Sequence, residues 1–296
     1  MAKELKGIIV PMVTPFNADE SLDEPALRRV VNYLIESGVL GLFPAGSQGE
    51  FYALTPHERK RITDVVIDEA DGRVAVMVGT GALTTRESIE LTRYAEAAGA
   101  DAVSVITPYF VKPSTEELRQ HFIRIARSVS IPVLAYNNPG RTGVHFTPTD
   151  AAKVAGAVDN LVGIKDSSGD LTNTMGYIEQ CPPAFKVFMG RDTLIYAGLC
   201  YGCVGAVAAT ANVVPRLVVA IYDAFVRGDH VLAIELQRKL SPLRSAFSLG
   251  SFPVVVKDAK ALVGQPAGPA RAPITSITGK AREALIAVLR DLGRIG

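Results

Sequence analysis

The sequence has no tryptophan, few cysteines and histidines, and no excess of charge of either sign. Among its 296 residues, 31 are Lys or Arg and 30 are Asp or Glu, so the formal net charge is +1. Nucleic-acid-binding proteins generally carry a basic surface, and this balance therefore argues against nucleic acid as a partner. No apolar run reaches the roughly 18 residues that predict a membrane span, and the N-terminal MAKELKG is too short and too charged for a signal peptide. We expect a cytoplasmic protein with no membrane partner that acts on small neutral or acidic metabolites.

The scarce cysteines and histidines also argue against a metal centre. The cysteines are Cys181, Cys200 and Cys203, and no second pair of Cys or His lies near them at zinc-site spacing. We interpret all three as buried, reduced thiols. The four histidines show no metal-ligand spacing either, so we assign them surface or packing roles. We expect no metal ion and no other cofactor.

Short apolar runs alternate with helical patterns along most of the chain. They span residues 7–13, 39–46, 73–81, 101–108, 131–139, 160–165, 185–190 and 202–209. Their spacing of roughly 20 to 35 residues is the length of one strand and one helix, and strands that alternate with helices lie parallel. Eight such units without a second domain predict an α/β protein of the closed (β/α)8 class, the TIM barrel.

Local signals support this count of helices and extend it beyond the barrel. Asp23, Thr55 and Ser114 each precede a helical pattern, and a glutamate follows the last two at capping-box spacing. Further helical patterns follow the eighth unit, near residues 229–247, 252–263 and 279–293. We therefore predict a catalytic barrel over residues 1–228 and a helical extension over residues 229–296 that packs on its flank.

Polar residues gather where the expected strands end, the face of such barrels that carries the chemistry. The second strand runs into GSQGE at 46–50, the fifth into YNNPGRTG at 136–143, and the sixth ends at Lys165. A lysine held out of water binds its proton less tightly, and its neutral amine is the nucleophile of Schiff-base chemistry. Two alternatives stay open from these residues alone. Lys165 could extend into solvent, and the glycine-rich loop could be a tight turn rather than an anion cradle.

Three motifs, taken together, resemble the family of dihydrodipicolinate synthase and N-acetylneuraminate lyase, which form a Schiff base with pyruvate. They are GSQGE at 46–50, YNNPGRTG at 136–143 and GIKDSSGD at 163–170, and the resemblance runs from about Gly7 to the C-terminus. It implies an eight-stranded barrel with a helical C-terminal extension, assembled as a homotetramer, a dimer of dimers. It also implies that the substrates are pyruvate and an aldehyde and that no cofactor is needed.

The resemblance assigns roles to individual residues. Lys165 would form an imine with the ketone of pyruvate, and the protonated imine would draw electrons so that the pyruvate methyl group becomes a nucleophile. Ser47 and Gln48 would hold the pyruvate carboxylate, and Tyr136 would shuttle protons. The other assignments are Arg141 for the aldehyde, Gly190 and Val207 around the keto acid, Thr80 as a supporting polar group and Phe110 at the third position of a proton relay.

That relay departs from the family pattern. The synthases use a threonine and two tyrosines, one of which reaches across from a neighbouring subunit, whereas these positions here are Ser47, Tyr136 and Phe110. Serine can pass on a proton, but phenylalanine cannot. The relay is therefore interrupted, or it is rerouted through water or through the neighbouring Tyr109.

The residues that bind lysine in feedback-inhibited members of the family also differ in this sequence. An asparagine and a glutamate after the third strand hold lysine in the inhibited members, and the matching residues here are Leu83 and Glu87. Nearby histidine positions read Pro56 and Arg59. We predict that lysine does not inhibit this protein.

The acceptor aldehyde is open to two interpretations. An arginine at the position of Arg141 binds the carboxylate of aspartate semialdehyde in the synthases, which predicts a condensation of pyruvate with an acidic aldehyde. Phe110 and the stretch GSFPVVVKDAKALVG at 250–264 are more similar to 2-keto-3-deoxy sugar-acid aldolases, which release pyruvate. We take the condensation as the leading hypothesis and the aldolase as the alternative. A third hypothesis is a catalytically weak homologue that only binds 2-oxo acids.

Overall fold

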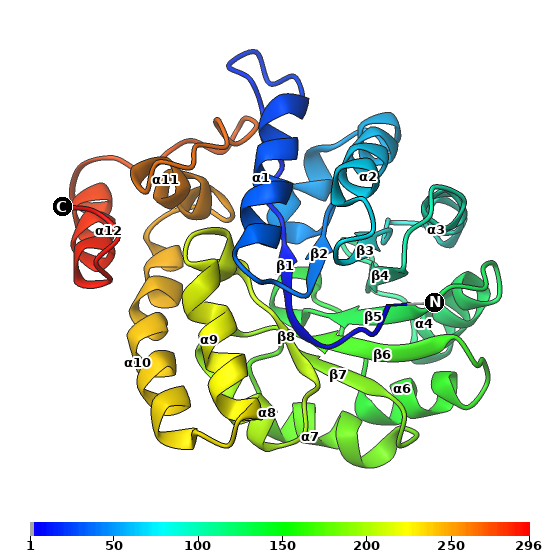
Figure 1. The fold of residues 1–296 in the computed structure, drawn as a ribbon. Helices are drawn as coiled ribbons and strands as arrows, with labels where there is room; N and C mark the ends of the chain where they lie inside the picture. The colour runs from blue at the N-terminus through cyan, green and yellow to red at the C-terminus, as the bar shows by residue number, and fades with distance from the viewer. Residues whose placement is uncertain (1–2) are drawn as a thin grey trace.

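The computed structural model describes residues 3–296, and it places eight strands in a closed barrel surrounded by helices (Figure 1). Every strand pairs in parallel with its neighbour in sequence, and β1 closes the sheet by pairing with β8. The predicted (β/α)8 barrel is thus confirmed. The strands are β1 (Gly7–Pro11), β2 (Gly41–Phe43), β3 (Ala75–Gly79), β4 (Ala102–Ile106), β5 (Val133–Asn137), β6 (Leu161–Asp166), β7 (Lys186–Met189) and β8 (Gly205–Val207).

The strands are apolar because both of their faces are covered. Side chains alternate between the inside of the barrel and the surrounding helices, as strand geometry requires. The inner set includes Ile9, Met77, Leu134 and Phe188, which pack against one another and fill the barrel. Chemistry is therefore confined to the mouth of the barrel, above this packed layer.

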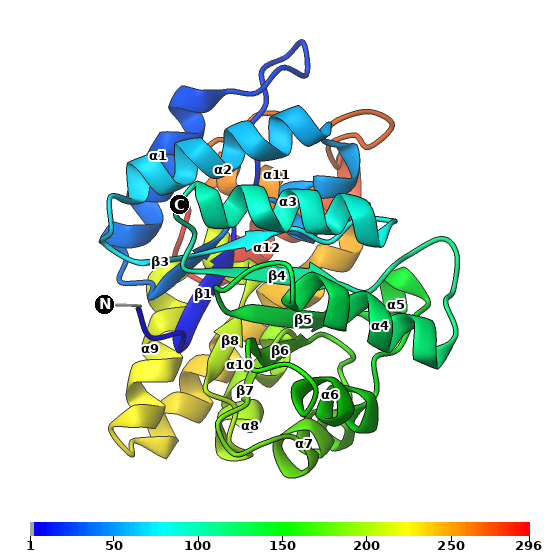
Figure 2. The same cartoon turned by 90° about the vertical axis from the view of Figure 1, so that its right-hand side faces the viewer.

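Helices cover the outside of the barrel, and most begin at a residue whose side chain caps them. Asp23 accepts a hydrogen bond from the amide of Ala26, and Thr55 and Ser114 form the predicted capping boxes. Figure 2 shows α2 and α3 side by side outside β3 and β4. The helices of this layer are α1 (Glu24–Glu36), α2 (Pro56–Ala70), α3 (Thr85–Ala97), α4 (Thr115–Ala126), α6 (Pro148–Ala155), α7 (Leu171–Gln180), α8 (Ile195–Cys200) and α9 (Pro215–Val226).

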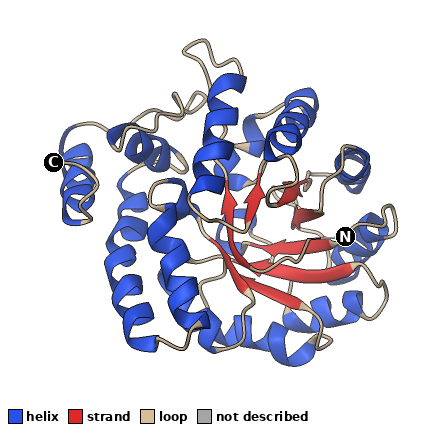
Figure 3. Cartoon of the chain, viewed as in Figure 1, coloured by secondary structure: helices blue, strands red, loops and turns tan. Residues whose placement is uncertain are grey.

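The helical extension consists of α10 (His230–Ala246), α11 (Val254–Leu262) and α12 (Gly279–Asp291), as Figure 3 makes visible beside the red strands. Asp229, in the turn between α9 and α10, caps α10 by accepting a hydrogen bond from the amide of Leu232. In Figure 1, α10 runs alongside α9 while α11 reaches the neighbourhood of α1. A hydrogen bond from the Lys260 amine to the carbonyl of Asn212 ties α11 to the loop that follows β8.

The cysteines differ in part from expectation. Cys181 and Cys203 are buried and unpaired, and burial raises the pKa of their thiols to about 11 and about 12, so both stay protonated. Cys200 is exposed, so the prediction of three buried thiols is wrong at that position. The reason is local, since α8 buries Gly198 and Leu199 and turns its last residue towards water.

Neither a metal-binding cluster nor a membrane-spanning helix is found within residues 3–296. Within residues 3–296, no group of three or more His, Cys, Asp or Glu side chains is placed to hold a metal ion. None of the helices in the same range combines the length and the apolar character needed to cross a membrane.

Candidate active site

A cavity of about 500 Å³ opens at the carboxyl ends of the strands. It brings together side chains from β5, β6 and β8 with loops that follow β2, β5 and β7, so residues far apart in the sequence become neighbours. Most of the residues singled out from the sequence line this cavity. They are Ser47, Gln48, Tyr136, Arg141, Lys165, Gly190 and Val207.

Lys165 lies in β6 with only 4% of its surface exposed. The register pairs it with Tyr136 of β5, and its amine lies 4.0 Å from the centre of the Tyr136 ring and 5.2 Å from that of Phe43. None of the ion pairs formed within residues 3–296 includes Lys165. The nitrogen therefore faces the cavity between two aromatic rings and is available to a carbonyl carbon bound there.

Tyr136 has its hydroxyl group in a polar setting inside an otherwise buried position. The amide of Asn138 donates a hydrogen bond of 2.9 Å to this hydroxyl. Burial by itself would raise the pKa of Tyr136, but the Lys165 charge and the hydroxyl groups of Ser47 and Ser167, together with that amide, outweigh burial and lower it. A phenol of this kind releases its proton more readily than an ordinary tyrosine, which suits it to move protons beside Lys165.

Ser47 and Gln48 begin a short 3₁₀ helix, η1 (Ser47–Gly49). The first amides of a helix have no carbonyl partner within it, so these N–H groups can bind an anion. The Gln48 side chain is held from the opposite side, where its amide donates a hydrogen bond of 3.3 Å to the carbonyl of Pro253. The loop GSQGE thus combines a tight turn with unpaired donors at the edge of the cavity.

Glu50 fixes this loop to the extension. Its backbone is left-handed, with φ of 59°, and its carboxylate pairs with the Lys257 amine at 2.6 Å, both side chains being 1% exposed. The same carboxylate accepts a hydrogen bond of 3.1 Å from the amide of Arg271, and the Thr14 hydroxyl donates one of 2.7 Å to the carbonyl of Gly49. Nothing in the motif itself indicated that its glutamate would anchor α11.

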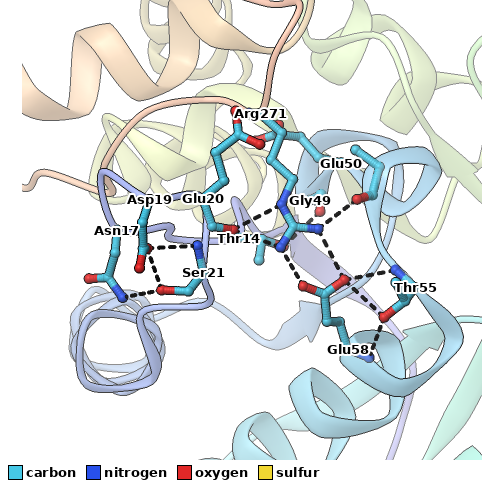
Figure 4. Close-up of polar contacts among 11 residues, drawn as sticks. Thr14, Asn17, Asp19, Glu20, Ser21, Gly49, Glu50, Thr55, Glu58 and Arg271 are labelled. Atoms are coloured by element: carbon cyan, nitrogen blue, oxygen red, sulfur yellow. Dashed lines mark hydrogen bonds and ion pairs between the residues drawn. The ribbon is translucent and has the colours of Figure 1, made fainter.

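Arg271 extends this network to the start of α2. In Figure 4 its guanidinium lies between the carbonyl of Glu20 and the carboxylate of Glu58. It also donates a hydrogen bond of 2.7 Å to the carbonyl of Ala53, just beyond the GSQGE loop. The extension therefore supports the loop from two sides.

Arg141 lies in the short helix α5 (Pro139–Thr142) that follows β5. Its guanidinium carbon sits 3.7 Å from the centre of the Phe252 ring, a stacking contact with the extension. Burial lowers the pKa of Arg141, and the positive charges of Arg244 and Arg191 act in the same direction. Arg141 takes part in no ion pair within residues 3–296, so its donors are free for an anionic ligand.

Gly190 and Val207 shape the inner part of the cavity. A Cβ atom at Gly190 would lie 2.1 Å from the Ser167 hydroxyl oxygen and 2.7 Å from the Asp166 carbonyl oxygen, so only glycine fits there. Val207 ends β8 and is almost fully buried beneath the cavity.

Thr80 and Phe110, the other two residues singled out from the sequence, do not line the cavity. The Thr80 hydroxyl accepts a hydrogen bond of 2.8 Å from that of Thr92, an outward contact with α3. Phe110 is 93% exposed on the loop between β4 and α4, in a left-handed conformation with φ of 72°. Its neighbour Tyr109 instead packs against Phe51, in the cluster that includes Tyr136.

Sequence reasoning gave no role to several lining residues, for two different reasons. Asn138, Ser167 and Ser168 lie in the motifs at 136–143 and 163–170, and Arg191 follows a strand, but these patterns alone assigned them no function. No sequence signal placed the residues of the extension at the barrel mouth, because only the packing of the extension brings them there. These residues are Arg244, Phe247, Ser248 and Phe252.

Comparisons with known proteins agree with this picture. The profile of the Dihydrodipicolinate synthetase family matches residues 4–292. The 4-hydroxy-tetrahydrodipicolinate synthase of Methanopyrus kandleri is 40% identical over 294 residues, which cover 99% of this chain and 98% of that protein. The corresponding protein of Pelobacter propionicus is 40% identical over 290 residues, or 98% and 99% of the two chains.

Solved structures of related proteins superpose on nearly the whole of this chain. Dihydrodipicolinate synthase from Aquifex aeolicus superposes with a TM-score of 0.95 at 29% identity, covering 98% of both chains. YagE from E. coli K12, a prophage protein of the same family solved in complex with pyruvate, gives 0.95 at 35% identity, covering 98% of this chain and 99% of its own. The matching barrel, extension and sequence lead to one conclusion: the chain belongs to the dihydrodipicolinate synthetase family, a family of lyases.

Proposed function

We propose that the protein joins pyruvate to an acidic aldehyde, such as aspartate semialdehyde, through an imine on Lys165. The observation that carries this proposal is the placement of Lys165, whose amine faces the cavity beside Tyr136 and takes part in no ion pair within residues 3–296. The names of the curated relatives support it, because several are 4-hydroxy-tetrahydrodipicolinate synthases.

The proposed reaction begins at the loop that contains Ser47 and Gln48. Their amides and the serine hydroxyl bind the pyruvate carboxylate, which directs the ketone carbon towards Lys165. The amine adds to that carbon and water leaves, so that a protonated imine forms. This imine stabilises the carbanion that remains when the methyl group loses a proton, and Tyr136 carries protons in both steps.

The second half of the reaction forms the carbon–carbon bond. The enamine carbon attacks the aldehyde carbon, and the aldehyde oxygen takes up a proton to become a hydroxyl group. Water then hydrolyses the imine, which releases a 4-hydroxy-2-oxo acid and restores the Lys165 amine. Arg141 would hold the carboxylate of the aldehyde through its planar pair of donors.

A pyruvate-releasing sugar-acid aldolase, the same path in reverse, remains the second candidate. The serine hydroxyls around the cavity favour it, because they suit a substrate with several hydroxyl groups. Phe110 also favours it, since this residue cannot serve the proton relay of the synthases.

We also propose a cytoplasmic location, a homotetrameric assembly and the absence of inhibition by lysine. A cytoplasmic location fits the absence of paired cysteines at positions 181, 200 and 203. A homotetramer fits the exposure of Phe110 on a loop at the barrel mouth. Lysine should not inhibit, because Leu83 replaces the asparagine that holds lysine in inhibited members. Arg59, at a nearby histidine position, instead donates a hydrogen bond of 2.8 Å to the carbonyl of Gly79.

Borohydride trapping tests the proposal directly. Reduction in the presence of pyruvate should attach one pyruvate to the wild-type protein, and peptide mass spectrometry should locate it on Lys165. Lys165→Ala should abolish the adduct, whereas Lys186→Ala should keep it, because Lys186 lies at the far end of β7. An adduct on the Lys165→Ala protein would refute the proposed nucleophile.

The same preparation separates the three functional hypotheses. Pyruvate consumption with aspartate semialdehyde supports the condensation, and pyruvate release from 2-keto-3-deoxygluconate or N-acetylneuraminate supports an aldolase. Binding of pyruvate without any adduct would indicate a homologue that only binds 2-oxo acids.

A further inference from the structure

The charge of the cavity exceeds what the proposed reaction uses. Its lining contains four cationic side chains and a single carboxylate, that of Asp192, so the formal charge of the lining is four minus one, or +3. Lys165 and Arg141 have roles in the proposed reaction. Arg191, which follows β7, and Arg244, near the end of α10, have none.

Asp192 forms an ion pair with only one of these two arginines, Arg244, and no hydrogen bond supports that pair. One of its carboxylate oxygens accepts hydrogen bonds of 2.7 Å and 2.6 Å from the amide and hydroxyl of Thr210. The other forms an ion pair of 3.8 Å with the Nε atom of Arg244, a distance too long for a hydrogen bond. Asp192 thus fixes the loop after β8, and Arg244 keeps its terminal donors for another partner.

Arg191 is held in place without a charged partner. Its guanidinium lies on the bare backbone of Gly169, where a Cβ atom would be 3.2 Å from Nε and 3.7 Å from Cζ. It forms no ion pair within residues 3–296. Arg141, Arg191 and Arg244 all line this one cavity, and the charges of Arg191 and Arg244 both act on Arg141.

The size of the cavity is consistent with a long substrate. Its volume of about 500 Å³ lies within the roughly 300–1,000 Å³ typical of pockets for drug-sized ligands. Pyruvate and a four-carbon aldehyde are much smaller than such ligands. Space therefore remains for a longer substrate, and Arg191 and Arg244 are part of the lining.

We propose that Arg191 and Arg244 form a second anion subsite, which binds a carboxylate or phosphate at the far end of the substrate chain. The inference deepens the proposed function and rests on it for the imine at Lys165. It predicts that the preferred substrates are 2-oxo acids with an anionic group at both ends. Charge-assisted hydrogen bonds to arginine contribute about 1.5–3 kcal/mol, roughly a 10- to 150-fold change in affinity.

Three six-carbon 4-hydroxy-2-oxo acids with the same skeleton test the proposal. Their far ends carry an alcohol (2-keto-3-deoxygluconate), a carboxylate (2-keto-3-deoxyglucarate) or a phosphate (2-keto-3-deoxy-6-phosphogluconate). The measurement is the concentration at which borohydride traps half of Lys165, which is valid whether or not the compound is cleaved. The wild type should reach half-trapping at a concentration at least 10-fold lower with one anionic compound than with the alcohol, and the favoured compound identifies the anion.

Variants then assign the preference to residues. Arg191→Gln and Arg244→Gln should each reduce the preference for the anionic compound several-fold. The concentrations of the alcohol and of pyruvate that give half-trapping should stay unchanged. Arg238→Gln is the matched control, because it removes the same charge from an exposed position of α10 away from the cavity. A wild type that does not distinguish the three compounds would overturn the proposal, as would a preference that only Arg141→Gln removes. Failure to trap even pyruvate would instead refute the proposed function itself.

Discussion

Two neighbouring residues, Lys165 and Tyr136, owe their closeness to the register between β5 and β6. The pairing places them opposite each other, and no loop has to order for them to meet. The positive charge beside the phenol lowers the pKa of Tyr136 against the effect of burial. The pair therefore has its proton donor in place before substrate binds.

Replacing Tyr136 by phenylalanine tests this arrangement. We expect kcat to fall about 10²- to 10⁴-fold, the usual contribution of one general acid–base group, with little change in the KM for pyruvate. Steady-state kinetics of pyruvate turnover would measure both constants. An unchanged kcat would show that another group moves the proton.

Tyr109→Phe is the matched control, and it also tests the rerouted relay. Tyr109 packs on Phe51 in the cluster that contains Tyr136, so it is the remaining phenol of that cluster. If protons leave the site through Tyr109, both variants should lose kcat. If water carries them, only Tyr136→Phe should be slow.

At the scale of elements, the loop after β2 depends on α11 through the pair of Glu50 and Lys257. Both side chains are buried, and burial lowers the pKa of Lys257 while the Glu50 carboxylate opposes that effect. Removal of one partner from such a pair leaves an uncompensated charge in the interior. The helical extension and the loop proposed to bind the pyruvate carboxylate should therefore be energetically coupled.

Lys257→Met should lower the free energy of unfolding by about 3–5 kcal/mol, the usual cost of breaking a buried ion pair. It should also weaken pyruvate binding, because the loop of Ser47 and Gln48 loses its anchor. Denaturant titration and half-trapping by pyruvate would measure the two effects. The double variant Glu50→Gln/Lys257→Met should recover part of the stability, and simple additivity of the two single variants would contradict the coupling.

The link between α2 and the extension predicts a dependence of stability on pH. The Arg271 guanidinium is the main cause that lowers the pKa of Glu58 from 4.5 to about 2. A carboxyl group whose pKa is lowered by folding stabilises the protein above the pKa of its unfolded state. This contribution is lost as pH falls from about 4.5 to about 2. The melting temperature of the Arg271→Gln variant should therefore fall less than that of the wild type over this pH interval. Parallel plots of melting temperature against pH would rule out a contribution from the Arg271–Glu58 pair.

At the scale of the whole molecule, apolar side chains on the loops after β3 and β4 face solvent in the single chain. Leu83, Phe110 and Val111 are 51%, 93% and 70% exposed. Exposed apolar groups on adjacent loops mark interaction surfaces, and a second copy of this chain is the partner that the proposed homotetramer requires.

Phe110→Asp should weaken that assembly, because it places a charge where an apolar contact is expected. Analytical ultracentrifugation should find a smaller species than for the wild type. Val231→Asp is the control, since Val231 is 81% exposed on α10. A Phe110→Asp protein with unchanged mass would place the interface elsewhere.

The barrel and the inner part of the site could be predicted from local patterns in the sequence. Eight apolar runs, separated by helical patterns with local caps such as Asp23 and Ser114, admit few other folds, because caps and periodicity act over a few residues. Since parallel strands end at one face, Ser47, Tyr136 and Lys165 could be expected to meet there.

The outer part of the site depends on tertiary packing and could not be predicted in this way. Arg244 and Phe252 reach the barrel mouth because α10 and α11 pack back onto it, a contact between segments with no shared local pattern. The exposure of Cys200 and the outward directions of Thr80 and Phe110 were likewise set by neighbours distant in sequence or by the turn of a helix. Short-range propensities fix which elements form, whereas side-chain surroundings depend on long-range packing that no single stretch encodes.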